Sequence, residues 1–333
     1  MDSGIRPFNQ ASWAISPKAR SFVVQESPYN PPGPNEVLVK NSAVAINPID
    51  FMVQDDAFLD YLQYPHILGC DVAGEIVEIG SEVKRFVVGQ RIIGYGFPYL
   101  AAKSTADQIR GNFSHGFGLD SGKAKHGAFQ NYTVCLATLS PPSTKPRSTG
   151  KTILIWGGAS SVGSCAIQLA RDSGYEVFTT ASPHNHALCS AWGAAMVFDY
   201  QKESVIDEII DALREKQVVG FFDAISKSYT IQACVDIIKR MQLNTKVITT
   251  NPIPGNVRLE GVVSEPVLGG DIAGNPVGKM LYEDYLPMAL QQKTFKPCPD
   301  PLIIGHGLEA IQAGVDRVKQ GVSSQKVVVT LGA

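Results

Sequence analysis

The alternation of hydrophobic and polar positions changes character near residue 150. Before that point, short β-rich runs are separated by turns rich in Pro and Gly, which is the pattern of strands in an antiparallel sheet. The expected strands are Ser21–Gln25, Glu36–Ile46, Gly74–Ile79, Arg91–Tyr95 and Phe129–Val134. The pattern predicts a compact, antiparallel, barrel-like domain.

After residue 150, runs with the period of a strand alternate with runs that have helical spacing. The expected strands are Thr152–Trp156, Tyr175–Thr180, Met196–Phe198, Gly220–Asp223 and Lys246–Thr250, and the expected helices begin at Val162, Val205 and Ile231. Such alternation predicts an α/β fold with a doubly wound parallel sheet. An amphipathic helix over Gly307–Lys319 and a strand over Lys326–Leu331 are expected at the end of the chain.

The segment Lys151–Ala170 joins a buried strand, a glycine-rich turn and a helix in direct succession. Glycines allow the backbone to turn sharply there, and the N–H groups at the start of the helix face a phosphate. The residues expected at the pyrophosphate are Gly157, Gly158, Ser160, Ser161, Val162 and Gly163. The alternative is a tight strand-to-helix turn that binds nothing, but the strand–turn–helix context favours a dinucleotide.

The end of the second strand of this unit indicates which dinucleotide is bound. Enzymes that use NAD usually place Asp or Glu there to hold the ribose 2′-hydroxyl. This chain has Ser182, Pro183, His184 and Asn185, whose polar groups can accept a 2′-phosphate, with Tyr200 as a wall for the adenine side. The sequence therefore favours NADPH over NADH. The alternative is an exposed turn and helix cap.

Composition restricts the partners. The chain has 333 residues, 18% of them charged, with a net charge of −2 and an isoelectric point near 6.3. It therefore lacks the excess of basic residues that binding to nucleic acid or to an acidic membrane requires. No apolar run of transmembrane length and no signal-peptide core is present, so we expect a cytoplasmic protein that acts on small molecules. The six cysteines are scattered, without zinc or disulfide spacing.

Several stretches together resemble one family, the medium-chain dehydrogenase/reductases. The stretches are AINPID at Ala45–Asp50, PHILGCDVAGEIVEIGSEVKRFVVGQRI at Pro65–Ile92, GAFQNYTV at Gly127–Val134, GGASSVGS from Gly157, and the terminal LEAIQAGVDRVKQGVSSQKVVV. In detail they are most similar to the zinc-independent quinone-oxidoreductase branch, and within it to fungal ToxD-like trans-acting enoyl reductases of polyketide pathways.

The resemblance implies a GroES-like catalytic domain built from both chain ends around a Rossmann domain, with NADPH and substrate meeting in a cleft. The expected boundaries are 1–140 for the first part of the catalytic domain, 141–150 for a linker and 151–285 for the Rossmann domain. Residues 286–333 are expected to return to the catalytic domain. A monomer or homodimer is expected. The implied reaction is NADPH-dependent reduction of an activated C=C in an enoyl thioester, enone or quinone, with a polyketide synthase as a candidate partner.

The resemblance also implies roles for individual residues. Asn47 and Asp50 are expected to orient groups near the nicotinamide ribose, and Asp223 and Asn251 to lie against the nicotinamide; their alternative interpretations are a turn, a helix cap and loop starts. Related enoyl reductases often carry Lys two residues after the Asp of this motif, where this chain has Met52. The proton donor therefore stays open, with Tyr95, Tyr99 and His126 as candidates.

Zinc is not expected. Zinc alcohol dehydrogenases of this family place Cys near the position of Pro48 and His-Glu after the glycine that matches Gly69, where this chain has Cys70 and Asp71. One cysteine and one carboxylate do not complete a three-ligand catalytic site. A true zinc alcohol dehydrogenase would have to hold stoichiometric metal.

We expect that a segment found in family members is absent here, since GAFQNYTVCLATL runs through the linker SPPSTKPRSTG directly into KTILIWGG. Its loss would expose apolar surface and open one wall of the cleft. Two hypotheses follow: a working reductase, or a catalytically impaired protein that binds NADPH or a partner.

Overall fold

The computed structural model describes residues 8–55, 64–95, 132–136, 148–267 and 280–332. These residues form two units, each with its own core. Unit 1 comprises Met1–Thr138, Pro301–Val322 and Lys326–Ala333, and unit 2 comprises Leu139–Asp300 and Ser323–Gln325. The chain thus returns to unit 1 at Pro301, later than the boundary at residue 286 predicted from the sequence. The reason is that Tyr285, Ala289 and Phe295 pack with Leu169 in unit 2.

Unit 1 is built from antiparallel strands around the long strand β3. Three strands pair directly with β3, namely β5, β7 and β15, and the order of the larger sheet is β14-β15-β3-β5-β6. A second sheet has the order β2-β1-β4. The strands are β1 (Gln10–Ala14), β2 (Val23–Glu26), β3 (Glu36–Ala45), β4 (His66–Ile67), β5 (Asp71–Ile79), β6 (Arg91–Tyr95), β7 (Tyr132–Leu136), β14 (Asp300–His306) and β15 (Gln325–Thr330).

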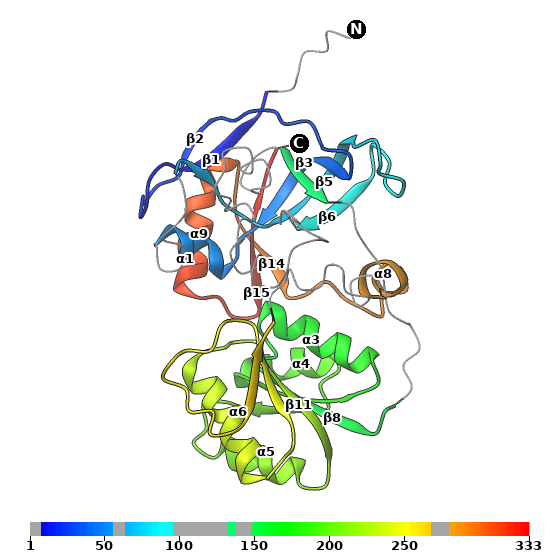
Figure 1. Cartoon of the computed structure of the whole chain (residues 1–333), viewed down its shortest axis with the longest axis vertical. Coiled ribbons are helices and arrows are strands. Elements are labelled where there is room, and N and C mark those ends of the chain that lie inside the picture. The colour runs from blue at the N-terminus through cyan, green and yellow to red at the C-terminus, as the bar shows by residue number, and fades with distance from the viewer. Residues whose placement is uncertain (1–7, 56–63, 96–131, 137–147, 268–279, 333) are drawn as a thin grey trace. The chain divides into compact units, whose positions relative to one another are not determined.

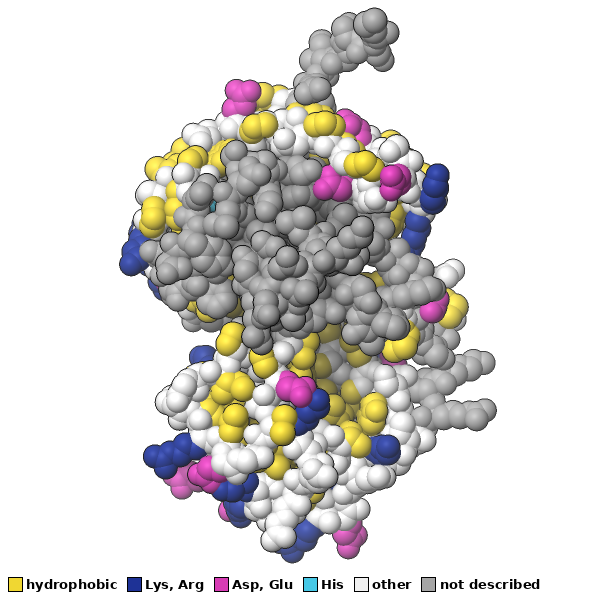
Figure 2. All heavy atoms as spheres, viewed as in Figure 1, with side chains coloured by type: hydrophobic (Ala, Val, Ile, Leu, Met, Phe, Trp, Pro, Cys, Tyr) yellow, Lys and Arg dark blue, Asp and Glu magenta, His cyan; other side chains and the backbone are white. Residues whose placement is uncertain are grey.

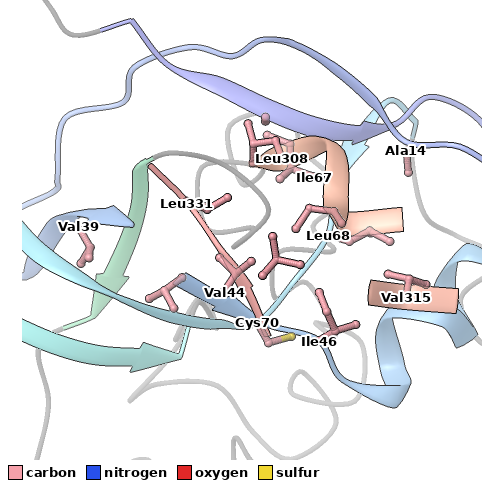
Figure 3. Close-up of a cluster of buried hydrophobic side chains, with 14 of the residues drawn as sticks. Ala14, Val39, Val44, Ile46, Ile67, Leu68, Cys70, Leu308, Val315 and Leu331 are labelled. Carbon is pink, nitrogen blue, oxygen red and sulfur yellow. The ribbon is translucent and has the colours of Figure 1, made fainter. Parts of the chain in front are cut away.

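Helices α1 (Pro48–Gln54) and α9 (Ile311–Gln320) cover this core and touch each other. They are joined by hydrogen bonds between the amides of Gln54 and Gln312, with Gln54 Nε2 at 2.7 Å from Gln312 Oε1. Figure 3 shows the apolar side chains that meet between them and the sheet, among them Ile46, Cys70 and Val315, all fully buried. Cys70 is therefore part of the hydrophobic core, as is usual for a thiol without a chemical role.

Unit 2 is a six-stranded parallel sheet in the order β10-β9-β8-β11-β12-β13. This is the order of a doubly wound dinucleotide-binding sheet, so the predicted α/β architecture is confirmed. The strands are β8 (Lys151–Trp156), β9 (Glu176–Ala181), β10 (Met196–Asp199), β11 (Gln217–Asp223), β12 (Lys246–Thr249) and β13 (Val263–Pro266).

Helices pack on both faces of this sheet. Helix α3 (Ser161–Asp172) packs beside α4 (His186–Trp192), and α5 (Val205–Leu213) beside α6 (Ser228–Arg240). Because successive residues of a strand point to opposite faces, the apolar residues of β8 contribute to the hydrophobic cores on both faces of the sheet. Leu154 and Trp156 join the core with α5 and α6, whereas Ile155 joins the core with α3 and α4.

Shorter elements complete unit 2. They are the one-turn 3₁₀ helix η2 (Pro183–Asn185), the π-helical turn η4 (Met280–Tyr285) and α8 (Leu286–Gln291); another short 3₁₀ turn, η5 (Leu308–Ala310), leads into α9 of unit 1. On the face shown in Figure 2, basic and acidic side chains of the described residues are interspersed. Within the described part of the chain, no helix has the length and apolarity needed to cross a bilayer.

Candidate functional site

The turn after β8 is shaped by three glycines that approach other atoms too closely for a side chain. Gly157 has φ +82°, a conformation that favours glycine. A Cβ on Gly158 would lie 2.2 Å from Thr179 Oγ1, and a Cβ on Gly163 would lie 2.2 Å from the carbonyl oxygen of Gly157. The role of Gly163 is therefore to bring the first turn of α3 against the glycine turn itself.

Hydrogen bonds fix this turn and leave the start of α3 open. Ser160 caps α3 by accepting from the N–H of Gly163 at 3.0 Å, and Thr180 accepts the N–H of Gly157 through Oγ1 at 2.9 Å. The N–H groups of Ser161 and Val162 belong to the first helical turn, where no preceding carbonyl can accept them. Val162 is 46% exposed. The geometry thus provides the glycine cradle and the helix N-terminus that a pyrophosphate requires.

The predicted ribose residues lie at the end of β9. Ser182 Oγ lies 3.0 Å from the hydroxyl of Tyr200, which follows β10. His184 Nε2 and Asn185 Nδ2 each lie 3.0 Å from Ser323 Oγ. Asn185 is buried and His184 is exposed. The structure therefore brings Ser182 and Tyr200 together, whereas the Asn185 side chain is directed to Ser323.

The ends of β11 and β12 carry the two other residues predicted at the cofactor. Asp223 is fully buried: Oδ1 accepts the N–H groups of Ile225 and Ser226 at 2.9 and 3.0 Å, and Oδ2 accepts the Thr230 hydroxyl at 2.6 Å. Burial raises the pKa of this carboxyl, against the effect of these hydrogen bonds. Both oxygens of Asp223 thus hold the turn into α6. Asn251 is exposed just after β12, and its contact with a nicotinamide stays a prediction.

Unit 1 contains a polar cluster that joins the start of α1 to two strands; we call it the Asn47 cluster, after the residue at its centre. Asn47 Nδ2 donates to Asp71 Oδ2 at 2.9 Å, and Lys326 Nζ donates to Asn47 Oδ1 at 2.5 Å. Lys326 also pairs with Asp71 at 3.2 Å. Asn47 and Asp50 were predicted at the site from the sequence; Asp71 and Lys326 were not predicted as its members.

Asp50 contacts this cluster through the backbone of Asn47, because its Oδ2 accepts the N–H of Asn47 at 2.7 Å. Its side chain is completely buried, and this burial raises the pKa of Asp50 to about 7. Asp71 raises the pKa further, while the hydrogen bond from Asn47 and the charge of Lys326 lower it. Asp50 therefore acts as the helix cap considered as an alternative from the sequence, and it also orients Asn47.

Other residues considered from the sequence contribute less here. Met52 lies on α1, partly buried. Tyr99 and His126 lie outside the described residues, as does the side chain of Tyr95. No group of three or more His, Cys, Asp or Glu side chains suited to a metal ion occurs among the residues that the structure describes.

Known proteins resemble the chain along both units. The family model of the alcohol dehydrogenase GroES-like domain matches residues 33–142, and that of the zinc-binding dehydrogenases matches residues 161–241. The dehydrogenase pigH of Monascus ruber is 35% identical, over 98% of this chain and 100% of its own length. The trans-enoyl reductase himH of Aspergillus japonicus is 38% identical, over 97% of each chain.

A solved structure of the crotonyl-CoA carboxylase/reductase AntE V350A in complex with NADP has the same fold, with a TM-score of 0.66 at 17% identity, covering 98% of this chain and 96% of that one. The two family models match parts of both units, and the curated relatives align over nearly the whole chain. The chain therefore belongs to the medium-chain dehydrogenase/reductase superfamily of oxidoreductases, in the branch of the fungal trans-enoyl reductases.

Proposed function

We propose that this protein is an NADPH-dependent reductase of an activated C=C bond. The observation that carries the proposal is the glycine turn at the carboxyl end of β8, between β9 and β11 in the sheet. This is the position at which doubly wound sheets bind dinucleotides. Gly158 and Gly163 let the turn pack closely against Thr179 and against the start of α3, and the N–H groups of the first turn of α3 are then placed to bind a pyrophosphate.

The preference for NADPH rests on the end of β9. Ser182 and Tyr200 present two hydroxyl groups 3.0 Å apart, with exposed His184 next to them in the chain. No carboxylate stands among Ser182, Pro183, His184 and Asn185 to repel a phosphate. Hydroxyl and imidazole donors therefore support a 2′-phosphate there, although no Arg or Lys follows directly.

Lys326 is our candidate for the group that binds the substrate carbonyl oxygen. Bound NADPH would supply a hydride for the β-carbon, and negative charge would then develop on that oxygen. An ammonium group has three protons, of which Asn47 and Asp71 hold two. The third proton of Lys326, whose side chain is 22% exposed, is available to stabilise the oxygen and to be transferred as the double bond is reduced.

The described residues Cys70 and Asp71 of unit 1 do not fit a catalytic zinc ion. Cys70 is 1% exposed within the core, and Asp71 is engaged by Asn47 and Lys326. We therefore propose a zinc-independent reaction, in which Lys326 takes the role that a Lewis acid has in zinc dehydrogenases. Metal analysis of the purified protein tests this, because stoichiometric zinc would contradict it.

The proposed substrates are enoyl thioesters, enones and quinones, whose C=C bond is activated by a conjugated oxygen. The fungal relative named as a trans-enoyl reductase supports an enoyl group as the substrate, and an acyl chain carried by a polyketide synthase is the form that we propose.

A second candidate function is NADPH binding without efficient turnover. The alignment with the Monascus ruber protein is 388 residues long, whereas this chain has 333 residues, which supports a missing segment relative to that protein. The proposed missing segment and Met52, in place of a lysine, favour this candidate.

Parallel fluorescence titrations with NADPH and NADH, followed by NADPH oxidation assays with crotonyl thioesters and with quinones, separate the candidates. Selective NADPH binding with turnover supports the reductase. Saturable NADPH binding without turnover on any of these substrates supports the binding protein. If neither nucleotide binds, both candidates are wrong for this chain.

A further inference from the structure

Two cysteines of unit 2 meet where α3 packs against the segment before β14. Cys165 lies on α3, and its Sγ lies 3.8 Å from the carbonyl oxygen of Cys298. Both thiols are partly exposed, whereas Cys70, Cys189 and Cys234 are buried. The mechanism proposed above uses neither Cys165 nor Cys298.

A buried glutamine directs a hydrogen-bond donor at Cys298. Gln168 is 1% exposed. Its Oε1 accepts the N–H of Lys296 at 2.9 Å, and its Nε2 donates to the Lys296 carbonyl at 3.0 Å. This double contact fixes which end of the amide is nitrogen. The second proton of Nε2 has two acceptors within reach, the Cys298 sulfur at 2.9 Å and the Ser164 carbonyl oxygen at 3.4 Å, and the sulfur is the nearer.

Hydrogen bonds to Cys298 favour its thiolate. The pKa of Cys298 is lowered to about 7, chiefly by the Cys165 thiol and then by Ser164 and Gln168, against burial and the nearby Asp300, which raise it. Burial raises the pKa of Cys189 to about 11 and that of Cys234 well above its usual value. Because the thiolate is the nucleophile, the structure separates one reactive cysteine from two inert ones.

We propose that Cys298 and Cys165 form a peroxide-reactive thiol pair, in which Cys298 is the attacking sulfur and Cys165 the resolving one. The Cys298 thiolate attacks a hydroperoxide oxygen, the O–O bond breaks, and Cys298 becomes a sulfenic acid while an alcohol or water leaves. The Cys165 thiol then displaces the hydroxyl group, so that an S–S bond forms and water is released. The two thiols lose two electrons, which the peroxide gains.

The oxidised pair would connect α3 covalently to the segment before β14. Cys165 stands two residues after Gly163 of the glycine turn, so the modification would lie on the helix proposed to hold the pyrophosphate. The inference itself does not depend on the proposed function, because it concerns only the thiols.

The first test is iodoacetamide labelling of the whole protein between pH 5.5 and 9.5, read by peptide mass spectrometry. At pH 7 a thiol of pKa about 7 is half ionised, whereas an ordinary thiol is ionised to a few per cent, and the lower intrinsic nucleophilicity offsets part of this gain. We expect Cys298 to react at least about fivefold faster than Cys70, Cys189 or Cys234, with a midpoint near pH 7. A midpoint above pH 8.5, or labelling no faster than these buried cysteines, would overturn the proposal.

The second test is treatment with stoichiometric hydrogen peroxide. Trypsin places Cys165 on Thr152–Arg171 and Cys298 on Thr294–Arg317, because the Lys296–Pro297 bond resists cleavage. The expected product is a disulfide between these two peptides. A Cys298 sulfenic acid that dimedone traps in the wild type, without any linked peptides, would contradict the resolving role of Cys165.

Three variants complete the test, with Cys298→Ser removing the attacking thiol itself. Cys165→Ala should move the midpoint of Cys298 labelling to higher pH, because the Cys165 thiol is the largest cause of the lowered pKa of Cys298, and should accumulate a dimedone adduct at Cys298 in place of the disulfide. Cys189→Ala, which removes a buried thiol of the same unit, is the matched control and should behave as the wild type. Loss of peroxide reactivity in Cys189→Ala but not in Cys298→Ser would refute the assignment, and thermal unfolding shows which variants are folded.

Discussion

Lys326 and Asn47 are 279 residues apart in the chain, yet Lys326 Nζ donates to Asn47 Oδ1 at 2.5 Å. The contact ties the start of α1 to the first residues of β15. Because Asn47 Nδ2 is held by Asp71 at the same time, the amide has one orientation. Lys326 is thus a candidate to replace the lysine that related enoyl reductases carry at the position of Met52.

Lys326→Met should lower kcat for enoyl-thioester reduction by about a hundredfold or more, the usual effect of removing one donor to a developing oxyanion or a general acid. NADPH affinity should change less than threefold. Steady-state kinetics and a fluorescence titration measure the two quantities. Lys319→Met, which removes a lysine paired with Asp55 just after α1, is the control and should keep kcat within about twofold. Equal losses in both variants would point to a structural effect.

Gly163→Ala should weaken NADPH binding. Its methyl group would lie 2.2 Å from the carbonyl oxygen of Gly157, a backbone atom that cannot move without opening the turn. We expect NADPH affinity to fall by more than about tenfold, with a loss of about 1–3 kcal/mol in stability from overpacking. Gly255→Ala has nothing within 4 Å of the added Cβ and should leave both quantities unchanged. Normal NADPH binding by Gly163→Ala would remove the glycine turn from the proposed site.

The sequence predicts unit 2 better than the Asn47 cluster because the signals of unit 2 are local. The turn from Gly157 to Gly163 consists of seven consecutive residues. Val205–Leu213 has apolar residues at helical spacing, and it forms α5 in the structure. The strand β14 was not predicted, since Pro301 and Gly305 interrupt its apolar residues. Asp71 and Lys326 stand in ordinary strand sequences, and only the antiparallel pairing of β3 with both β5 and β15 brings them to Asn47.

Asp50 should make stability depend on pH. Its pKa is raised from 3.8 to about 7, so between these values the unfolded carboxyl loses its proton while the native one keeps it. The native state is therefore destabilised as the pH rises through this window. Asp50→Asn keeps an oxygen for the Asn47 N–H and cannot ionise.

From pH 5 to pH 8, the free energy of unfolding of Asp50→Asn should thus gain about 2 kcal/mol relative to the wild type, and at most about 3. Urea denaturation at the two values measures the difference. Asp55→Asn, an acid-to-amide change at a partly exposed position, is the control for altered net charge. A constant difference between Asp50→Asn and the wild type would show that Asp50 ionises normally.

Ser182→Asp should shift the cofactor preference toward NADH. A carboxylate at the end of β9 would repel a 2′-phosphate and could accept the ribose hydroxyls of NADH. Since like charges at contact distance cost several kcal/mol near a protein surface, we expect NADPH affinity to fall by about ten- to a hundredfold, while NADH affinity is maintained or improved. Ser190→Asp, on the exposed side of α4, carries the same charge and should leave the ratio unchanged. If both variants weaken NADPH equally, net charge is responsible, and the 2′-phosphate lies elsewhere than at Ser182 and Tyr200.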